Sequence, residues 1–160
     1  MIGLIQRTNS ASVTIEGKRV ARTGAGMLVL VGFTRDDAER CLDRFVERLL
    51  NYRLFPDDAG RMNRSLRDVE GELLVVPQFT LAADTNAGNR PSFTPAAPPD
   101  EGRKLFDALQ RKLHDAWPAS AFGVFGADMQ VALVNDGPVT FRLEVVSVDP
   151  DSGAAGNAGA

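Results

Sequence analysis

The first third of the chain carries the hydrophobic patterning of β-strands. Residues 1–6 are apolar and suited to a strand, and apolar residues alternate with polar ones from residue 11 to residue 16. Such alternation is typical of a strand with one buried face. Residues 27–31 form a continuous apolar run between two glycines, which predicts a strand buried on both faces. Gly17 and Lys18 are expected to form the turn after the first pattern.

Two segments carry the three-and-four-residue repeat of an amphipathic helix. The first spans residues 38–50, and Thr34 with Asp37 resembles a capping box before it. The second begins near Asp100 and is stopped by Pro118. Each helix has one apolar face, so we expect both to cover one side of a sheet.

The rest of the chain predicts three more strands and two irregular stretches. Residues 72–76 form another buried strand, and the alternation in residues 129–133 and 141–145 predicts two further strands with a turn between them. An exposed loop or short turn is expected for the arginine-rich residues 57–70. An irregular connection is expected for residues 82–99, which contain four prolines.

Strands outnumber helices, which predicts an α+β fold. We expect a mostly antiparallel, barrel-like β-sheet with the two main helices packed on one side. The length of 160 residues fits a single domain. We place that domain at residues 1–148, because residues 149–160 are Gly, Ala, Ser, Asn, Asp and Pro without apolar periodicity. This tail is expected to be disordered.

Composition excludes several classes of protein. The chain has one cysteine and one histidine, so it forms no internal disulfide, no cysteine-rich zinc site and no two-histidine metal site. We therefore expect no metal and no cofactor. Cys41 lies on the apolar stripe of the first helix and is expected to be buried, whereas His114 is expected at the surface. No stretch reaches the ~20 apolar residues of a membrane span, and the N-terminus lacks the features of a signal peptide. These features predict a soluble, cytoplasmic protein with no membrane partner.

The net charge of -3 argues against a protein coated in positive charge. Proteins that hold nucleic acid non-specifically carry such a coat, so we expect no DNA partner. The acidity does not exclude the capture of one RNA end by a local arginine patch.

Three polar segments stand at predicted strand ends, and no phosphate-binding loop or nucleophile elbow accompanies them. In the first, Gln78 and Thr80 could face a ligand, or Thr80 could only close a turn. In the second, Arg90 could hold a phosphate or carboxylate and Phe93 could stack on a base, or the segment could be a proline-stiffened surface loop. The third, residues 135–138, could form a fixed turn. Its backbone carbonyls could hold an ammonium group and exclude one side-chain direction at a chiral carbon.

At these segments the sequence resembles the D-aminoacyl-tRNA deacylase (D-tyrosyl-tRNA deacylase) family. The resemblance runs from Met1 to about Val145. Its motifs, in chain order, are MIGLIQR (1–7), PQFTL (77–81), NRPSF (89–93), DM (128–129) and NDGPVT (135–140). Any one of these motifs alone would be a weak signal, but several in the right order are a strong one.

The resemblance implies an enzyme of chiral proofreading in translation. The family hydrolyses the ester that joins a D-amino acid to the 3′-terminal adenosine of tRNA, acts on glycyl-tRNA as well, and needs no metal. The resemblance also implies a homodimer with active sites at the subunit interface. In the family the Gly137-Pro138 bond is cis, and the pair reaches into the partner subunit's site and selects against L-amino acids. Arg7 stands at the position that braces this pair.

Roles for the other site residues follow from the same resemblance. Thr80 matches the threonine once proposed as the nucleophile, and Gln78 lies in the same catalytic segment. A later view gives the main role to the 2′-hydroxyl of the tRNA itself. A threonine nucleophile normally needs a nearby base, and the sequence offers none, so we favour Thr80 as an orienting hydroxyl. Substrate-binding roles are implied for Pro77, Phe79, Arg90, Ser92, Phe93, Met129 and Asn135.

One position departs from the family pattern, and two alternatives to chiral proofreading stay open, of which only the first rests on this position. Position 77 is usually serine but is proline here. A related branch that edits L-alanine carries this proline but changes the phenylalanine position, whereas this chain keeps Phe79. The first alternative is a deacylase shifted toward glycine or L-alanine on tRNA. The second is a non-catalytic module that binds the tRNA end through Arg90, Phe93 and the arginines of residues 61–67.

Overall fold

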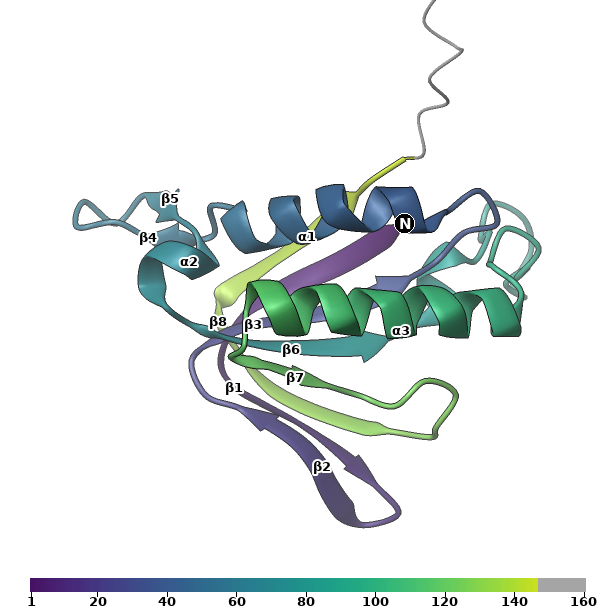
Figure 1. Cartoon of the computed structure of the whole chain (residues 1–160), viewed down its shortest axis with the longest axis horizontal. Helices are drawn as coiled ribbons and strands as arrows, with labels where there is room; N and C mark the ends of the chain where they lie inside the picture. Colours follow the sequence, from purple (N-terminus) through teal and green to yellow (C-terminus); the bar gives the residue numbers. More distant parts are fainter. Residues whose placement is uncertain (147–160) are drawn as a thin grey trace, which may run out of the picture.

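The computed structural model describes residues 1–146 as one α+β unit (Figure 1). The predicted disordered tail, residues 149–160, lies outside the described residues. The strands are β1 (Ile2–Ile15), β2 (Lys18–Thr23), β3 (Gly26–Gly32), β4 (Phe55–Pro56), β5 (Met62–Arg64), β6 (Glu72–Pro77), β7 (Ser120–Phe122) and β8 (Gln130–Glu144). The helices are α1 (Leu42–Asn51), α2 (Leu66–Val69) and α3 (Pro99–Ala116), with 3₁₀ turns η1 (Glu39–Cys41) and η2 (Phe79–Ala82).

In the described residues, three of the five strand pairings of the main sheet are antiparallel, in line with the expectation, and two are parallel, so the sheet is mixed. Its order is β2-β1-β3-β6-β7, and β8 pairs with β1 along its whole length, giving a nearly closed, barrel-like sheet. β1 is antiparallel to β2, β3 and β8, but β3 and β6 are parallel, as are β6 and β7. The parallel pairs arise because α1 lies in the connection from β3 to β6, and α3 in the connection from β6 to β7.

Both main helices lie on one face of the sheet, as predicted (Figure 1). Phe45 of α1 and Phe106 of α3 are buried against alternate residues of β3 and β6, including Met27 and Val75. The intervening residues of the same strands form a second cluster on the other face of the sheet: Leu28, Leu74 and Val76. The continuous apolar runs of β3 and β6 therefore reflect burial on both faces, as expected.

Two long strands replace four predicted segments. β1 and β8 each run through the point where the sequence predicted an interruption. They stay paired because the ladder continues on either side of residues 135–138, with register shifts between Gln6 and Thr8 and between Thr8 and Ser10. The fixed turn expected at residues 135–138 is thus a bulge within one strand: residues 136–139 have no partner on β1, and pairing continues at Asn135 and Thr140.

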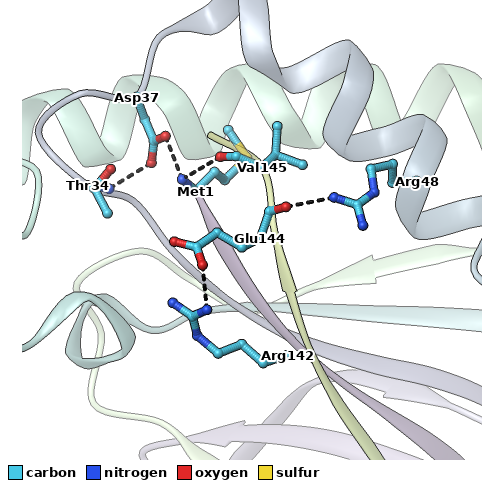
Figure 2. Close-up of polar contacts among 7 residues, drawn as sticks. All are labelled: Met1, Thr34, Asp37, Arg48, Arg142, Glu144 and Val145. Atoms are coloured by element: carbon cyan, nitrogen blue, oxygen red, sulfur yellow. Dashed lines mark hydrogen bonds and ion pairs between the residues drawn. The ribbon is translucent and has the colours of Figure 1, made fainter. Parts of the chain in front are cut away.

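The expected capping box at Thr34 is wrong as a helix start. The helical chain begins later, because Ala38 precedes η1 and Cys41 precedes α1. Asp37 does accept a hydrogen bond from the backbone N–H of Thr34 at 2.7 Å, but its other oxygen holds the α-amino group of Met1 at 2.5 Å. Figure 2 shows that this amino group also donates to the Val145 carbonyl, so the N-terminus is held against the residue that follows β8.

Residues 57–70 contain more structure than the expected loop. They hold β5, which pairs with β4, and the short helix α2. A capping box does occur here: Ser65 accepts from the backbone N–H of Asp68, and Asp68 accepts from that of Ser65. Hydrogen bonds from the Ser65 backbone and side chain lower the pKa of Asp68. Cys41 is buried and His114 exposed, as predicted.

Candidate functional site

The first site segment lies at the C-terminal end of strand β6. The backbone N–H of Gln78 donates to the Val31 carbonyl at 2.7 Å, so residue 78 still belongs to the ladder with β3. β7 pairs with β6 only as far as Val75, and the chain of β7 then turns away at Gly123. Pro77 has no N–H to donate, and at this position β7 no longer pairs with β6 and accepts no hydrogen bond from it. A proline therefore fits at the end of this buried strand.

The structure brings the amide of Gln78 and the hydroxyl of Thr80 together. The Gln78 side-chain N–H donates to Thr80 Oγ1 at 2.6 Å, across the first turn of η2. This bond leaves the hydroxyl proton of Thr80 free to point outward. In residues 1–146 the Thr80 hydroxyl contacts no titratable side chain, so these residues supply no base for a threonine nucleophile.

An aromatic pair brings the second predicted segment to the first. The rings of Phe79 and Phe93 lie 5.1 Å apart, and the two residues are 56% and 43% exposed. The loop before Phe93 is closed by reciprocal backbone hydrogen bonds between Asp84 and Ser92 at 2.8 and 2.9 Å. Exposed aromatic rings are ready to stack on a nucleobase.

Arg90 and Ser92 do not reach this pair. Arg90 is exposed on the loop and makes no hydrogen bond or ion pair with the rest of residues 1–146. The Ser92 hydroxyl donates to Thr94 Oγ1 at 3.1 Å, within its own loop. The predicted substrate-binding roles of Arg90 and Ser92 therefore remain predictions.

A largely apolar pocket of about 450 Å³ opens beside Gln78. It lies between the end of β6, the start of α3 and residues 125–131, and Pro77, Phe79 and Met129 line it. No charged side chain lines this pocket, so it suits a flat, uncharged ligand group.

Phe125 is a pocket residue that the sequence analysis missed. A side chain at position 102 would meet the Phe125 ring at 3.1 Å, so Gly102 in the first turn of α3 leaves room for the ring. The guanidinium of Arg103 lies 5.0 Å above the same ring. The glycine inside a helical pattern was the one signal that could have revealed this packing.

The third predicted segment is fixed by side chains on both sides of it. Arg7 donates to the carbonyls of Leu54 at 2.9 Å and Asp136 at 3.1 Å, and its Nε lies 2.9 Å from the Asp136 carboxylate. Asn135 accepts from the backbone N–H of Val139 at 2.7 Å. It donates in turn to Thr140 Oγ1 at 2.9 Å. These bonds close the bulge at residues 135–139 into one defined shape.

Gly137 and Pro138 lie exposed at the tip of this bulge, joined by a cis peptide bond as predicted. Gly137 has φ +133°, which L-residues rarely adopt. A Cβ there would lie 2.7 Å from Val139 Cγ2 and 3.2 Å from Arg7 Nη2. Both the backbone conformation and the surrounding space therefore require glycine.

The site residues fall into two groups at different places on one chain. Gln78 bonds to Val31, whereas Arg7 pairs with Met27, four residues earlier on the same strand. At about 3.3 Å per residue this separation is about 13 Å along β3. One group contains Pro77, Gln78, Phe79, Thr80, Phe93 and Met129; the other contains Arg7, Asn135, Gly137 and Pro138.

Two further observations bear on the kind of site. In residues 1–146, no three His, Cys, Asp or Glu side chains gather as metal ligands would. None of the helices in these residues is both long and apolar enough to pass through a bilayer.

Comparison with known proteins matches the whole described domain. The model of the family described as D-Tyr-tRNA(Tyr) deacylase matches residues 4–144. The D-aminoacyl-tRNA deacylase of Nitrosococcus oceani is 55% identical, covering 91% of this chain and 94% of that protein. That of Alkalilimnicola ehrlichii is 57% identical, covering 90% and 96%.

Solved structures match as well. The structure of the c-Myc DNA Unwinding Element Binding Protein is 35% identical, with a TM-score of 0.87, and covers 92% of this chain and 100% of that chain. A probable eukaryotic D-amino acid tRNA deacylase shares the fold, with a TM-score of 0.79 at 19% identity. The family model covers nearly all of the described residues, and the relatives match over about nine tenths of the chain. The chain therefore belongs to the D-Tyr-tRNA(Tyr) deacylase family.

Proposed function

We propose that this protein proofreads aminoacyl-tRNA by removing D-amino acids, and that it acts on glycyl-tRNA as well. The chain is a D-aminoacyl-tRNA deacylase, a hydrolase of the ester between the amino acid and the tRNA. Support for the finer statement comes from the two groups of site residues, which suit ester hydrolysis and chirality selection respectively. The cytoplasmic location stays a sequence-based prediction.

The reaction proceeds with a nucleophile that the protein does not supply. Water adds to the ester carbonyl, the bond to the 3′-oxygen of the terminal ribose breaks, and that oxygen takes up a proton. The neighbouring 2′-hydroxyl orients the water and relays the proton, because it is already held next to the ester. The Gln78 amide and the Thr80 hydroxyl, joined at 2.6 Å, orient the ester, and the backbone N–H groups of Phe79 and Thr80 face the developing oxyanion.

The terminal adenosine occupies the apolar pocket beside Gln78. A nucleobase is flat and largely apolar on its faces, which fits a 450 Å³ pocket lined by Phe79, Phe125 and Met129 without a charge. The exposed Phe79–Phe93 pair stacks on the nucleotide that precedes it.

The observation that carries this proposal is the separation of the two groups. Measured along β3, Gly137 and Pro138 lie about 13 Å from Gln78. This distance is too large for both groups of one chain to contact the same amino acid. A homodimer solves this problem if Gly137 and Pro138 of one subunit enter the site formed by Gln78 and Thr80 of the other. The exposed carbonyls there hold the ammonium group of the substrate and leave no room for an L side chain.

The test compares D-Tyr-tRNA, L-Tyr-tRNA and Gly-tRNA with purified protein. We expect release of D-tyrosine and glycine but not of L-tyrosine. Analytical ultracentrifugation should give a dimer. D-Tyr-tRNA with a 2′-deoxy terminal adenosine should bind but resist cleavage. No release of D-tyrosine at stoichiometric enzyme would refute the proposal, and tight binding of uncharged tRNA without any cleavage would favour the non-catalytic module.

Pro77 favours one second candidate, a deacylase shifted toward glycine or L-alanine. Pro77 lines the pocket beside Gln78, so it can change how the ester sits there. Assays with L-Ala-tRNA, Gly-tRNA and D-Tyr-tRNA decide between the two functions. Faster cleavage of L-Ala-tRNA than of D-Tyr-tRNA would establish the second.

A further inference from the structure

A second groove, of about 650 Å³, lies at the end of the molecule that carries Gly137. Its walls are the last turns of α1, the segment that follows α1, and β8. Arg44, Arg48 and Arg53 line it, and we call it the arginine groove. The rings of Tyr52 and Phe141, with centroids 5.6 Å apart, also line it and join α1 to β8.

In residues 1–146 the three arginines of this groove form no ion pair with a carboxylate. Arg48 donates to the backbone carbonyl of Glu144 at 2.7 Å, while the Glu144 carboxylate is held by Arg142 at 2.5 Å (Figure 2). The hydrogen bond from Arg142 lowers the pKa of Glu144. Arg53 donates to the carbonyl and the side-chain oxygen of Asn63, at 3.0 and 2.7 Å, and both are neutral.

Arg44 makes no hydrogen bond or ion pair with the rest of residues 1–146. Of the described residues, Glu47 is the only acidic one that lines the groove, which leaves an excess of two positive charges in a chain of net charge -3. Several exposed cations elsewhere are paired instead, such as Arg64 with Asp58 and Lys112 with Asp43. The groove therefore gathers guanidinium groups that have no carboxylate partner. A guanidinium group can bind phosphate through two parallel hydrogen bonds.

The arginine groove lies next to Gly137 and Pro138. Arg7, which braces these residues through Asp136, also bonds to the carbonyl of Leu54, the neighbour of Arg53. Phe141 follows Pro138 by three residues of β8, which is about 10 Å of extended strand. A tRNA whose aminoacyl end meets Gly137 therefore brings its acceptor end within reach of the groove.

We propose that the arginine groove binds backbone phosphates of the tRNA acceptor end while its ester is cleaved at the site of the partner subunit. This inference rests on the proposed function, because it requires tRNA as substrate and Gly137 to act across the dimer. Every tRNA presents backbone phosphates there, so the groove adds affinity without reading sequence.

The experiment measures the binding of uncharged tRNA to Arg44→Gln and to Arg44→Gln/Arg48→Gln across a range of salt concentrations. Each lost phosphate contact should reduce the slope of log Kd against log salt by about 0.7–0.9. In hydrolysis of D-Tyr-tRNA, KM should rise while kcat stays near the wild-type value, because the arginines act on binding alone. Arg44→Lys should keep the slope.

Arg111→Gln, an exposed arginine of α3 outside the groove, is the control for a lost charge alone. The inference is overturned if the slope does not change, if Arg111→Gln lowers it equally, or if the double variant becomes monomeric, which would make the groove a subunit interface. Continued cleavage of D-Tyr-tRNA with an unchanged slope would reject the groove and leave the proposed function standing. A wild-type protein that neither binds nor cleaves would reject the function.

Discussion

The two groups of site residues differ in how firmly the fold holds them. At the reaction end, formed by residues 77–80 with Phe93 and Met129, a single 2.6 Å hydrogen bond joins Gln78 to Thr80, and Phe79 is 56% exposed. At the filter end, formed by Arg7 and residues 135–138, the Arg7 side chain is only 14% exposed. Arg7 bonds to the carbonyl and the carboxylate of Asp136 and to the Leu54 carbonyl, and Asn135 bonds to Val139 and Thr140.

This difference matches what the proposed function requires of each end. A reaction whose nucleophile belongs to the substrate needs few protein groups, and these can settle when the ester arrives. Discrimination between mirror-image substrates requires atoms that do not move, because a shift of about 1 Å would admit the wrong side chain. Backbone carbonyls fixed by arginine and asparagine meet that requirement better than flexible side chains do.

The largest effect is expected for Gly137→Ala, which breaks the filter end. The new Cβ would lie 2.7 Å from Val139 Cγ2 in a backbone conformation with φ +133°. The bulge must therefore shift, and we expect kcat/KM for D-Tyr-tRNA to fall about 100-fold. Gly17→Ala is the matched control, because Gly17 has φ +75° but nothing within 4 Å of its Cβ position. A normal rate for Gly137→Ala would show that the filter end is not rigid.

Arg7→Lys tests the bracing of the filter end. Lysine keeps the charge, but its single ammonium group lacks the planar fork of donors with which Arg7 contacts two carbonyls and a carboxylate. Losing one charged hydrogen bond costs about 1.5–3 kcal/mol, so we expect the ratio of D-Tyr-tRNA to L-Tyr-tRNA hydrolysis to fall about tenfold or more. Arg142→Lys, which concerns an exposed ion pair with Glu144, serves as the control. Equal ratios in both variants would contradict a bracing role for Arg7.

Thr80→Val tests the reaction end and should have a smaller effect. The variant removes the hydroxyl that accepts from Gln78 but keeps the shape of the side chain. An orienting hydrogen bond contributes about 1 kcal/mol, so we expect kcat to fall about five- to tenfold, with full activity in Thr80→Ser. Complete loss of single-turnover cleavage in Thr80→Val would instead identify Thr80 as the nucleophile.

Most of the fold could be predicted from the sequence, because burial leaves a periodic pattern. The two helices and the strands buried on both faces follow from apolar spacing. The spacing does not show which strands pair or in which direction. β1 and β8 were therefore each predicted as two segments, and the parallel direction of some strand pairs was not predicted. β7 has three half-buried residues and gives no pattern at all.

The segments proposed for the site could be selected from the sequence, but their arrangement could not. Gln78, Thr80, Gly137 and Pro138 were found because polar groups, glycine and proline interrupt strand patterns. Their separation along β3 depends on the register of β1, which only the structure provides. The arginines of the groove could not be singled out, because Arg44 and Arg48 lie on the polar face of an ordinary amphipathic helix.

The smallest effect is expected for Pro77→Ser, which sharpens the comparison between the two ends. Residue 77 belongs to the reaction end, where serine would supply an N–H and a hydroxyl to the pocket beside Gln78. If chirality is selected only at the filter end, this change alters rates in parallel for all substrates. We therefore expect the ratio of D-Ala-tRNA to L-Ala-tRNA hydrolysis to change less than about threefold, which is below 1 kcal/mol. A tenfold change in that ratio, measured with the two alanyl substrates under single-turnover conditions, would mean that the reaction end also reads the configuration of the amino acid.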